Sequence, residues 1–307
     1  MAHVISRPVV GLVALTGILA AAASATGVFL RGDLATQVVT TVRGDQVDVL
    51  LGGVYRFNGE AVAAEGVGWD AVTLFLVVPA LFLLLPALRR GSSRARLATM
   101  GILVYFLYQY FEYATFLAYG PLFLLYVSTF ALSLTGVALL GASLDLGVIA
   151  NGVTPGFPRR PMIAFGIFMA VLLGGLWLPL IASTFGAEQV PQLEGATTFV
   201  VQAFDLGLLV PLGLFTAVTV WRRLPVGYVL SAIVVIKGMA MGTSIAAMMA
   251  VETVATGESQ VPPMILFAGI ALLCTALAVR VYGSVHDPGT QPPAHPVDPR
   301  MAHRSTV

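Results

Sequence analysis

Three ionisable residues interrupt long apolar runs of the sequence. Glu112 lies in "YFLYQYFEYATF", Asp205 follows "TTFVVQAF", and Lys237 is at the centre of "VVIKGMAMG". Ionisable groups at membrane depth are costly, so they face the bundle interior or water and mark functional sites. A buried lysine could pair with one acid, and the surplus acid would then take up a proton because burial disfavours its charge. This chemistry suits a proton-coupled transporter.

Other polar side chains share helix faces with these three residues. The tyrosines at 105 and 108, Gln109 and Glu112 follow the spacing i, i+3, i+4, i+7, and Gln202 lies three residues before Asp205. We therefore predict one buried polar pocket. Its candidate residues are Tyr105, Tyr108, Gln109, Glu112, Gln202, Asp205 and Lys237.

Two alternatives to a functional pocket stay open. The lysine and one acid could form a structural ion pair that fixes the register of two helices, with the tyrosines as ordinary packing. Alternatively, Glu112 and Lys237 never meet, and each reaches an interface or a water defect. Whether Lys237 pairs with Asp205 or with Glu112 is also open.

The composition defines the elements that must hold these residues. Of 307 residues, 58% are hydrophobic and 10% are charged, and the mean hydropathy is +0.91, which is typical of a membrane protein. About 20 apolar residues span a bilayer. We predict an all-α polytopic membrane protein with about eight transmembrane helices, near 8–30, 71–88, 97–117, 122–141, 162–185, 197–221, 227–251 and 262–284.

Basic residues give the orientation of this bundle. Twelve of the sixteen lie in loops and termini that the eight spans place on one side, against three on the other side and the buried Lys237. The richer side should be cytoplasmic. We expect a multi-pass protein of the cytoplasmic membrane with both termini in the cytoplasm. Alternatively, Arg7 and Ala23-Ser24-Ala25 imitate a signal peptide whose cleavage would leave seven spans.

The predicted domain organisation is a transmembrane bundle over 1–285 and a disordered, Pro-rich cytoplasmic tail over 286–307. Residues 31–70 form the longest segment outside the spans. Asn58-Gly59 lies there between β-prone residues, which favours a β-hairpin with its turn at this pair. Two strands alone are marginal in water, so we expect a small extracytoplasmic cap on the bundle.

Two segments suggest an internal repeat. Residues 69–91 and 204–227 each contain an aromatic-Asp pair, then Val-Pro, then Arg-Arg, and both run from outside to inside. This pattern favours two parallel four-helix halves, although convergence of apolar sequence is the alternative. We expect kinks at Pro79 and Pro211. Over residues 69–140 and 200–250 the chain resembles an uncharacterised kind of bacterial multi-span inner-membrane protein, a resemblance that implies membrane location and no activity.

Several classes of function are disfavoured. All four histidines lie in terminal segments, so we predict no haem, no metal site and no other cofactor. The methionines near Lys237 are common core filler rather than copper ligands, and the surroundings of Lys237 lack the tryptophans of a retinal pocket. No hydrolase, zinc-protease or phosphate-loop motif is found, so we favour a protein that is not an enzyme. A net charge of +1 indicates no nucleic-acid partner.

The leading hypothesis is a secondary transporter or permease-like protein for a small solute or proton, with the lipid bilayer as its surroundings. The alternative is a non-catalytic membrane scaffold or sensor that binds an extracytoplasmic protein partner through residues 31–70. A hydrated cavity beside Asp205 and Lys237 would favour transport, whereas an exposed apolar patch on 31–70 would favour a partner.

Overall fold

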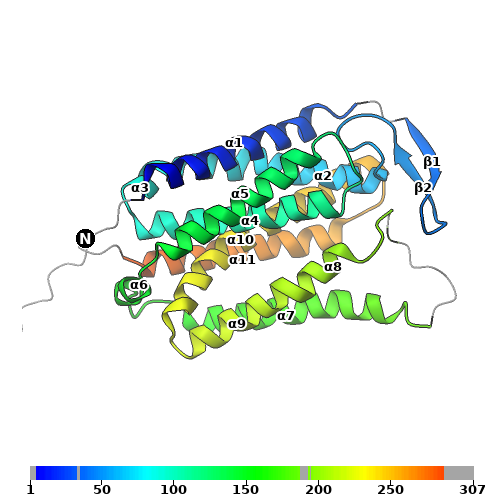
Figure 1. Cartoon of the computed structure of the whole chain (residues 1–307). Coiled ribbons are helices and arrows are strands. Elements are labelled where there is room, and N and C mark those ends of the chain that lie inside the picture. The colour runs from blue at the N-terminus through cyan, green and yellow to red at the C-terminus, as the bar shows by residue number, and fades with distance from the viewer. Residues whose placement is uncertain (1–4, 33–34, 187–192, 194, 287–307) are drawn as a thin grey trace, which may run out of the picture.

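The computed structural model of the chain describes residues 5–32, 35–186, 193 and 195–286. Its long helices run side by side and reverse direction at successive connections, as Figure 1 shows. The N-terminal end of the first helix and the C-terminal end of the last lie at the same end of the bundle, where Val153 and Val285 form an isolated β-bridge. Apart from His286, the predicted cytoplasmic tail falls outside the described residues.

The elements follow one another along the chain with short connections. In order they are α1 (Arg7–Phe29), β1 (Thr36–Thr40), β2 (Gln46–Leu50), α2 (Glu60–Val72), η1 (Thr73–Val77), α3 (Val78–Arg89), α4 (Ser93–Thr115), α5 (Phe123–Ala142), α6 (Leu146–Gly152), α7 (Arg159–Ala182), α8 (Val200–Phe204), η2 (Asp205–Leu209), α9 (Val210–Trp221), α10 (Pro225–Thr256) and α11 (Val261–Ser284).

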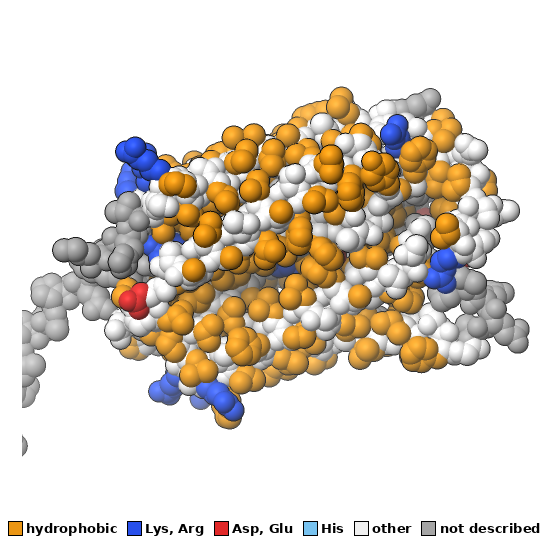
Figure 2. Space-filling view, in the orientation of Figure 1, with side chains coloured by type: hydrophobic (Ala, Val, Ile, Leu, Met, Phe, Trp, Pro, Cys, Tyr) orange, Lys and Arg blue, Asp and Glu red, His pale blue; other side chains and the backbone are white. Residues whose placement is uncertain are grey.

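Seven helices among the described residues are long and apolar enough to cross a membrane. They are α1, the continuous helix 60–89 formed by α2, η1 and α3, α5, α7, the continuous helix 200–221 formed by α8, η2 and α9, α10 and α11. Hydrophobic side chains cover the flank of the bundle in Figure 2, and lysines and arginines gather towards its two ends. The all-α membrane class is therefore supported.

The predicted span 97–117 corresponds to α4, which is not one of these seven helices. At 23 residues it is long enough, but it carries Gln109, Glu112 and several tyrosines. Most of its residues are buried by neighbouring helices. A helix shielded from lipid does not need an apolar surface, so low hydropathy alone does not decide whether α4 crosses. The count of eight spans remains a prediction.

The predicted hairpin exists, but its turn lies elsewhere. Strands β1 and β2 pair antiparallel from Thr36↔Leu50 to Thr40↔Gln46, so the turn lies at residues 41–45. Asn58-Gly59 instead leads into α2, with Gly59 at the N-cap and the Asn58 side chain accepting a hydrogen bond from Ala118 N at 2.8 Å. The predicted turn was wrong because the residues after it, rich in alanine, form a helix rather than a strand. The second span accordingly begins at Glu60 rather than near 71.

Both repeat segments contain a π-helical turn at the same place relative to a proline. In η1 and in η2 five π-helical residues are followed by Val-Pro, with the prolines at 79 and 211. A π turn inserts an extra residue into the helical repeat and often marks a functional site. The two segments are therefore similar in backbone conformation as well as in sequence. The division into two four-helix halves remains a prediction.

Small residues allow the helices to approach closely. A β-carbon at Gly68 of α2 would lie 2.6 Å from Ala247 O of α10, and one at Gly166 of α7 would lie 2.5 Å from Gly213 O of α9. Such contacts are typical of membrane helices, which gain stability from backbone proximity rather than from the hydrophobic effect. They join α2 to α10 and α7 to α9, and the pocket described below lies between these two pairs.

Candidate functional site

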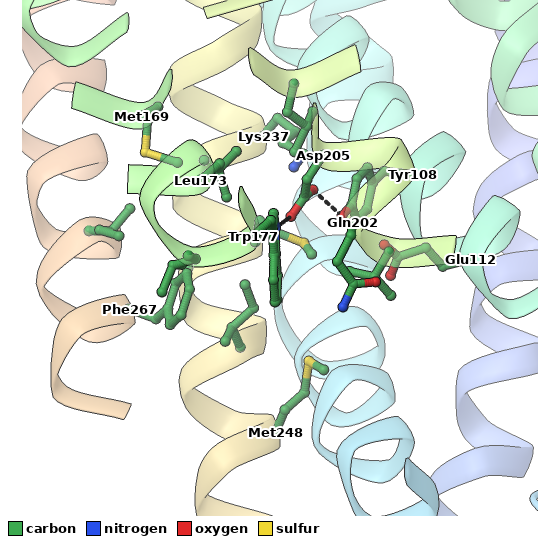
Figure 3. A pocket seen from close by; sticks show the side chains of 18 of the residues that line it. Tyr108, Glu112, Met169, Leu173, Trp177, Gln202, Asp205, Lys237, Met248 and Phe267 are labelled. Carbon is green, nitrogen blue, oxygen red and sulfur yellow. Dashed lines mark hydrogen bonds between the residues drawn. The ribbon is translucent and has the colours of Figure 1, made fainter. Parts of the chain in front are cut away.

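A cavity of about 990 Å³ separates the hairpin of α7 and α9 from the rest of the bundle. Residues of α2, α4, α7, α8, η2, α9, α10 and α11 line it. The walls are mostly apolar, and Figure 3 shows polar side chains of α4, α8, η2 and α10 among the lining residues, with Tyr108, Glu112, Gln202, Asp205 and Lys237 labelled. The volume is within the range of small-molecule sites in proteins.

Five of the seven predicted site residues line this cavity. They are Tyr108, Glu112, Gln202, Asp205 and Lys237. Tyr105 and Gln109 are not among the lining residues: both bond to Thr73 Oγ1 of η1, at 2.7 Å from the Tyr105 hydroxyl and 2.9 Å from Gln109 Oε1. Of the four predicted polar residues of α4, Tyr108 and Glu112 therefore line the cavity, and Tyr105 and Gln109 belong to a second polar network.

Asp205 is held by two hydrogen bonds from different helices. Its Oδ1 accepts from the Tyr108 hydroxyl of α4 at 2.6 Å, and its Oδ2 accepts from Trp177 Nε1 of α7 at 2.8 Å. The carboxyl group is the first side chain of η2, so the π turn sets the direction in which it points. Trp177 was not a predicted site residue, although its position within a span was visible in the sequence.

Lys237 meets an aromatic ring rather than a hydrogen-bond acceptor. Its Nζ lies 4.1 Å from the centroid of the Tyr108 ring, and within the described residues it donates no hydrogen bond. The side chain is 8% exposed. A cation over an aromatic face is stabilised by the quadrupole of the ring. Tyr108 therefore contacts both charges, Lys237 through its ring and Asp205 through its hydroxyl.

Two buried polar atoms beside the cavity have no hydrogen-bond partner among the described residues. One is Glu112 Oε1, an acceptor on a side chain that is 5% exposed, and the other is Trp69 Nε1, a donor. Both residues line the cavity. Unsatisfied buried polar groups are rare and costly, and each calls for an explanation such as a ligand or water. Here both side chains line a cavity that a ligand could fill.

A second polar network surrounds Asp70. Asp70 is 1% exposed, and its Oδ2 accepts a hydrogen bond from the Tyr55 hydroxyl. Tyr113 and Gln109 of α4 donate to Oδ1, each at 3.4 Å. Because α2 begins at Glu60, earlier than the predicted span 71–88, Asp70 lies inside the bundle rather than at its surface.

The Asp70 network continues across the bundle through hydroxyl groups. From Gln109 it passes to Thr73, then to Tyr105, and ends at Ser244 Oγ of α10, 2.8 Å from the Tyr105 hydroxyl. Gly27 of α1 makes room for it, because a β-carbon there would overlap the Asp70 carboxyl group. The network joins α2, η1, α4 and α10, and it reaches the cavity wall at Tyr113.

The arrangement offers binding and proton transfer rather than nucleophilic or metal chemistry. Among the residues described, no three His, Cys, Asp or Glu side chains gather closely enough to hold a metal ion. Comparison with protein-family models, with curated proteins and with solved structures gives no match to this chain. The seven apolar helices support the class of multi-pass integral membrane proteins, here with an ionisable cavity inside the bundle.

Proposed function

We propose that this chain is a secondary transporter or permease-like protein that carries a small solute across the cytoplasmic membrane. In this proposal the cavity between the α7–α9 hairpin and the rest of the bundle is the solute site. Glu112 takes up a proton when no solute occupies the cavity, because burial favours the neutral form of a carboxyl group. The solute and the proton would then bind alternately at Glu112.

The observation that carries the proposal is the pair of unpartnered atoms at the cavity wall. Glu112 Oε1 and Trp69 Nε1 are buried without a hydrogen bond among the described residues, and the Lys237 ammonium group near them contacts the Tyr108 ring. A scaffold gains nothing from leaving two buried polar atoms unsatisfied beside a cavity, since each atom costs stability. A binding site gains affinity, because a ligand can satisfy them.

The interrupted helices add a second argument. In transporters, broken or bent helices line the substrate site and act as pivots. The π turn η2 lies directly at Asp205 and is followed by Pro211, and both η2 and α9 line the cavity. The α7–α9 hairpin could therefore move against α10 without unfolding, and thereby open the cavity to one side at a time.

Cysteine accessibility tests whether the cavity is hydrated. Cys274 is the one cysteine of the chain and is buried, so Cys274→Ala provides a background without reactive thiols. In that background we expect Gln202→Cys and Met241→Cys to react with a membrane-impermeant methanethiosulfonate. Reaction from both faces, in right-side-out and inside-out vesicles, is the result expected of alternating access.

The matched control is Ser133→Cys, a buried position on α5 away from the cavity lining. It should not react from either face. If the two cavity positions are as inert as Ser133→Cys, the cavity is dry and the transport proposal is overturned. Reaction from one face only would indicate a receptor-like site rather than a carrier.

The alternative, a scaffold or sensor that binds a partner through residues 31–70, has one observation in its favour. Val42 at the hairpin turn is 93% exposed, and Val38 and Leu51 nearby are also exposed. Exposed apolar side chains at a tip can be contact residues for another protein. A photo-crosslinker at position 42 that yields one specific adduct in native membranes, together with a dry cavity, would favour this function over transport.

A further inference from the structure

We propose that the solute is a hydrophobic organic cation, an amine or quaternary onium group on an aromatic or branched apolar body, whose positive centre lies beside Glu112. This inference rests on the proposed function of the cavity as a solute site. It names the chemical class that the charge balance and the walls of the cavity would select.

The ionisable groups of the cavity favour a cation. Among its described lining residues, acids come from three elements, Glu65 from α2, Glu112 from α4 and Asp205 from η2, whereas Lys237 of α10 is the one base. The described lining residues of α7, α9 and α11 add no charged group. A cavity lined by an excess of one sign concentrates ligands of the opposite sign, and low-dielectric walls strengthen this effect.

The acids are not equivalent, because one of them is already compensated. Asp205 has a donor on each carboxylate oxygen, and it shares Tyr108 with Lys237. Lysine, tyrosine, aspartate and tryptophan thus form a unit in which one positive charge opposes one negative charge. Glu112 also adjoins Tyr108 and Lys237, but its Oε1 is buried without a hydrogen-bond partner among the described residues. A ligand cation is the group that would satisfy it, and an anion would meet Glu112 and Glu65 as well as the already engaged lysine.

The walls select an apolar cation over a hydrated ion. Trp69, Trp177, Phe165 and Phe267 line the cavity, and so do several methionines, among them Met241. Aromatic faces attract cations, most strongly when these are weakly hydrated. Methionine side chains adapt to ligands of different shape. A small inorganic cation would lose its water without gaining oxygen ligands, whereas an onium ion on an apolar body would lose little.

Two probes of the same shape and opposite charge test the inference. Tetraphenylphosphonium and tetraphenylborate differ in the sign of the central charge and share their four phenyl groups. Equilibrium dialysis of each radiolabelled probe against the full chain in nanodiscs, with empty nanodiscs subtracted, measures saturable binding. We expect tetraphenylphosphonium to bind at least tenfold more tightly than tetraphenylborate.

Substitutions of single residues test whether the probe binds beside Glu112. Glu112→Gln should weaken binding of tetraphenylphosphonium at least tenfold, because the acid whose Oε1 lacks a hydrogen bond among the described residues is lost. Glu252→Gln is the matched control: Glu252 is also a buried acid, but it is hydrogen-bonded to Gln260 and does not line the cavity. The affinity of the Glu252→Gln variant for tetraphenylphosphonium should equal that of the wild type. Lys237→Met should tighten binding of the cation, because a competing positive charge is removed.

The outcomes separate this inference from the proposed function. If tetraphenylborate binds as tightly as tetraphenylphosphonium, or if Glu112→Gln and Glu252→Gln behave alike, the cation assignment is overturned while a solute site remains. The same holds if neither probe binds but Gln202→Cys is reactive. If neither probe binds and Gln202→Cys is inert, the inference and the transport proposal fail together.

Discussion

Residues of the same type have different surroundings in this chain. Asp205, Glu112 and Asp70 are all buried carboxyl groups, yet Asp205 receives a hydroxyl and an indole donor, Asp70 receives hydroxyl and amide donors, and Glu112 keeps one oxygen open. Tyr108 joins Asp205 to Lys237, through its hydroxyl and its ring respectively. Donor arrangement, rather than burial, therefore distinguishes their roles.

The first prediction concerns the coupling of these charges. Asp205→Asn should lower the free energy of unfolding by roughly 3 kcal/mol, because it leaves the buried Lys237 without a compensating charge. Lys237→Met should lower it as well, and the double variant should lose less than the sum of the two. Unfolding in detergent, followed by far-ultraviolet circular dichroism, measures all three.

Glu112→Gln is the contrasting variant in that series. Because it replaces a carboxyl group whose Oε1 has no hydrogen-bond partner among the described residues, it should leave the stability unchanged or raise it. A loss as large as that of Asp205→Asn would show that Glu112, and not Asp205, is the partner of the lysine. Strict additivity of Lys237→Met and Asp205→Asn would rule out an interaction between them.

The second prediction concerns Tyr55, which joins the segment between β2 and α2 to Asp70. Burial, and next the nearby charge of Asp70, raise the pKa of Tyr55 well above its ordinary value of 10.0, so its hydroxyl remains a donor. Tyr55→Phe should cost about 1–3 kcal/mol, because Asp70 loses a hydrogen bond while buried. Thermal unfolding in detergent measures the loss.

The pH dependence follows from the sign of that shift. A tyrosine with a raised pKa in the folded state contributes stability below its unfolded pKa, and this stability is lost as pH rises. The difference between wild type and Tyr55→Phe should therefore shrink above about pH 10. Tyr119→Phe, at an exposed position, is the control and should leave both stability and its pH dependence unchanged. A difference that grows above pH 10 would contradict the argument.

At the scale of elements, the π turns determine which side chains face the cavity. An α-helix turns by about 100° per residue. One inserted residue therefore rotates the side chains before it by that angle relative to the side chains after it. In η2 the insertion begins at Asp205 and immediately precedes the pair Val210-Pro211. The direction of the Asp205 side chain is thus a property of the backbone, not of the residue alone.

The third prediction removes this insertion. Deleting Gly207 from η2 should restore α-helical spacing and rotate Asp205 away from Tyr108 and Trp177. The reactivity of Gln202→Cys should then fall severalfold. The control is Gly207→Ala at the same position, where a β-carbon would meet no atom within 4 Å. The substitution should leave the reactivity unchanged. An equal loss in both variants would mean that the residue type, rather than the π turn, matters.

At the scale of the whole molecule, α4 decides the number of passes. It lies among other helices, whereas the seven apolar helices present hydrophobic flanks outward. If α4 crosses, the connection before it and the connection after it face opposite sides of the membrane. The orientation predicted from arginines then places the connection before α4 in the cytoplasm.

The fourth prediction tests that arrangement with single cysteines in the Cys274→Ala background. Tyr119→Cys, after α4, should react with an impermeant thiol reagent added to intact cells. Arg90→Cys, before α4, should react only once the membrane is permeabilised. Both side chains are exposed, so access to the reagent is not limited by packing. Reaction of both positions in intact cells would mean that α4 does not cross.

The sequence by itself determined the class of the protein and the approximate place of its helices. Apolar runs of about 20 residues have one stable form in a membrane, because every backbone polar group must be bonded within the helix. It also identified the rare ionisable residues, since their cost in a membrane makes them visible. For the same reason Asp205, Glu112 and Lys237 could be named as candidates without knowledge of their partners.

Only the tertiary structure decided how these residues are grouped. Spacing on α4 placed Tyr105 and Gln109 with Tyr108 and Glu112, but a helix among neighbours presents different faces to different partners. The hairpin turn, the burial of Asp70 and the hydrogen bond from Trp177 likewise depend on where α2 begins and how α7 approaches η2. Such contacts join residues far apart in the chain, and local sequence patterns carry no information about them.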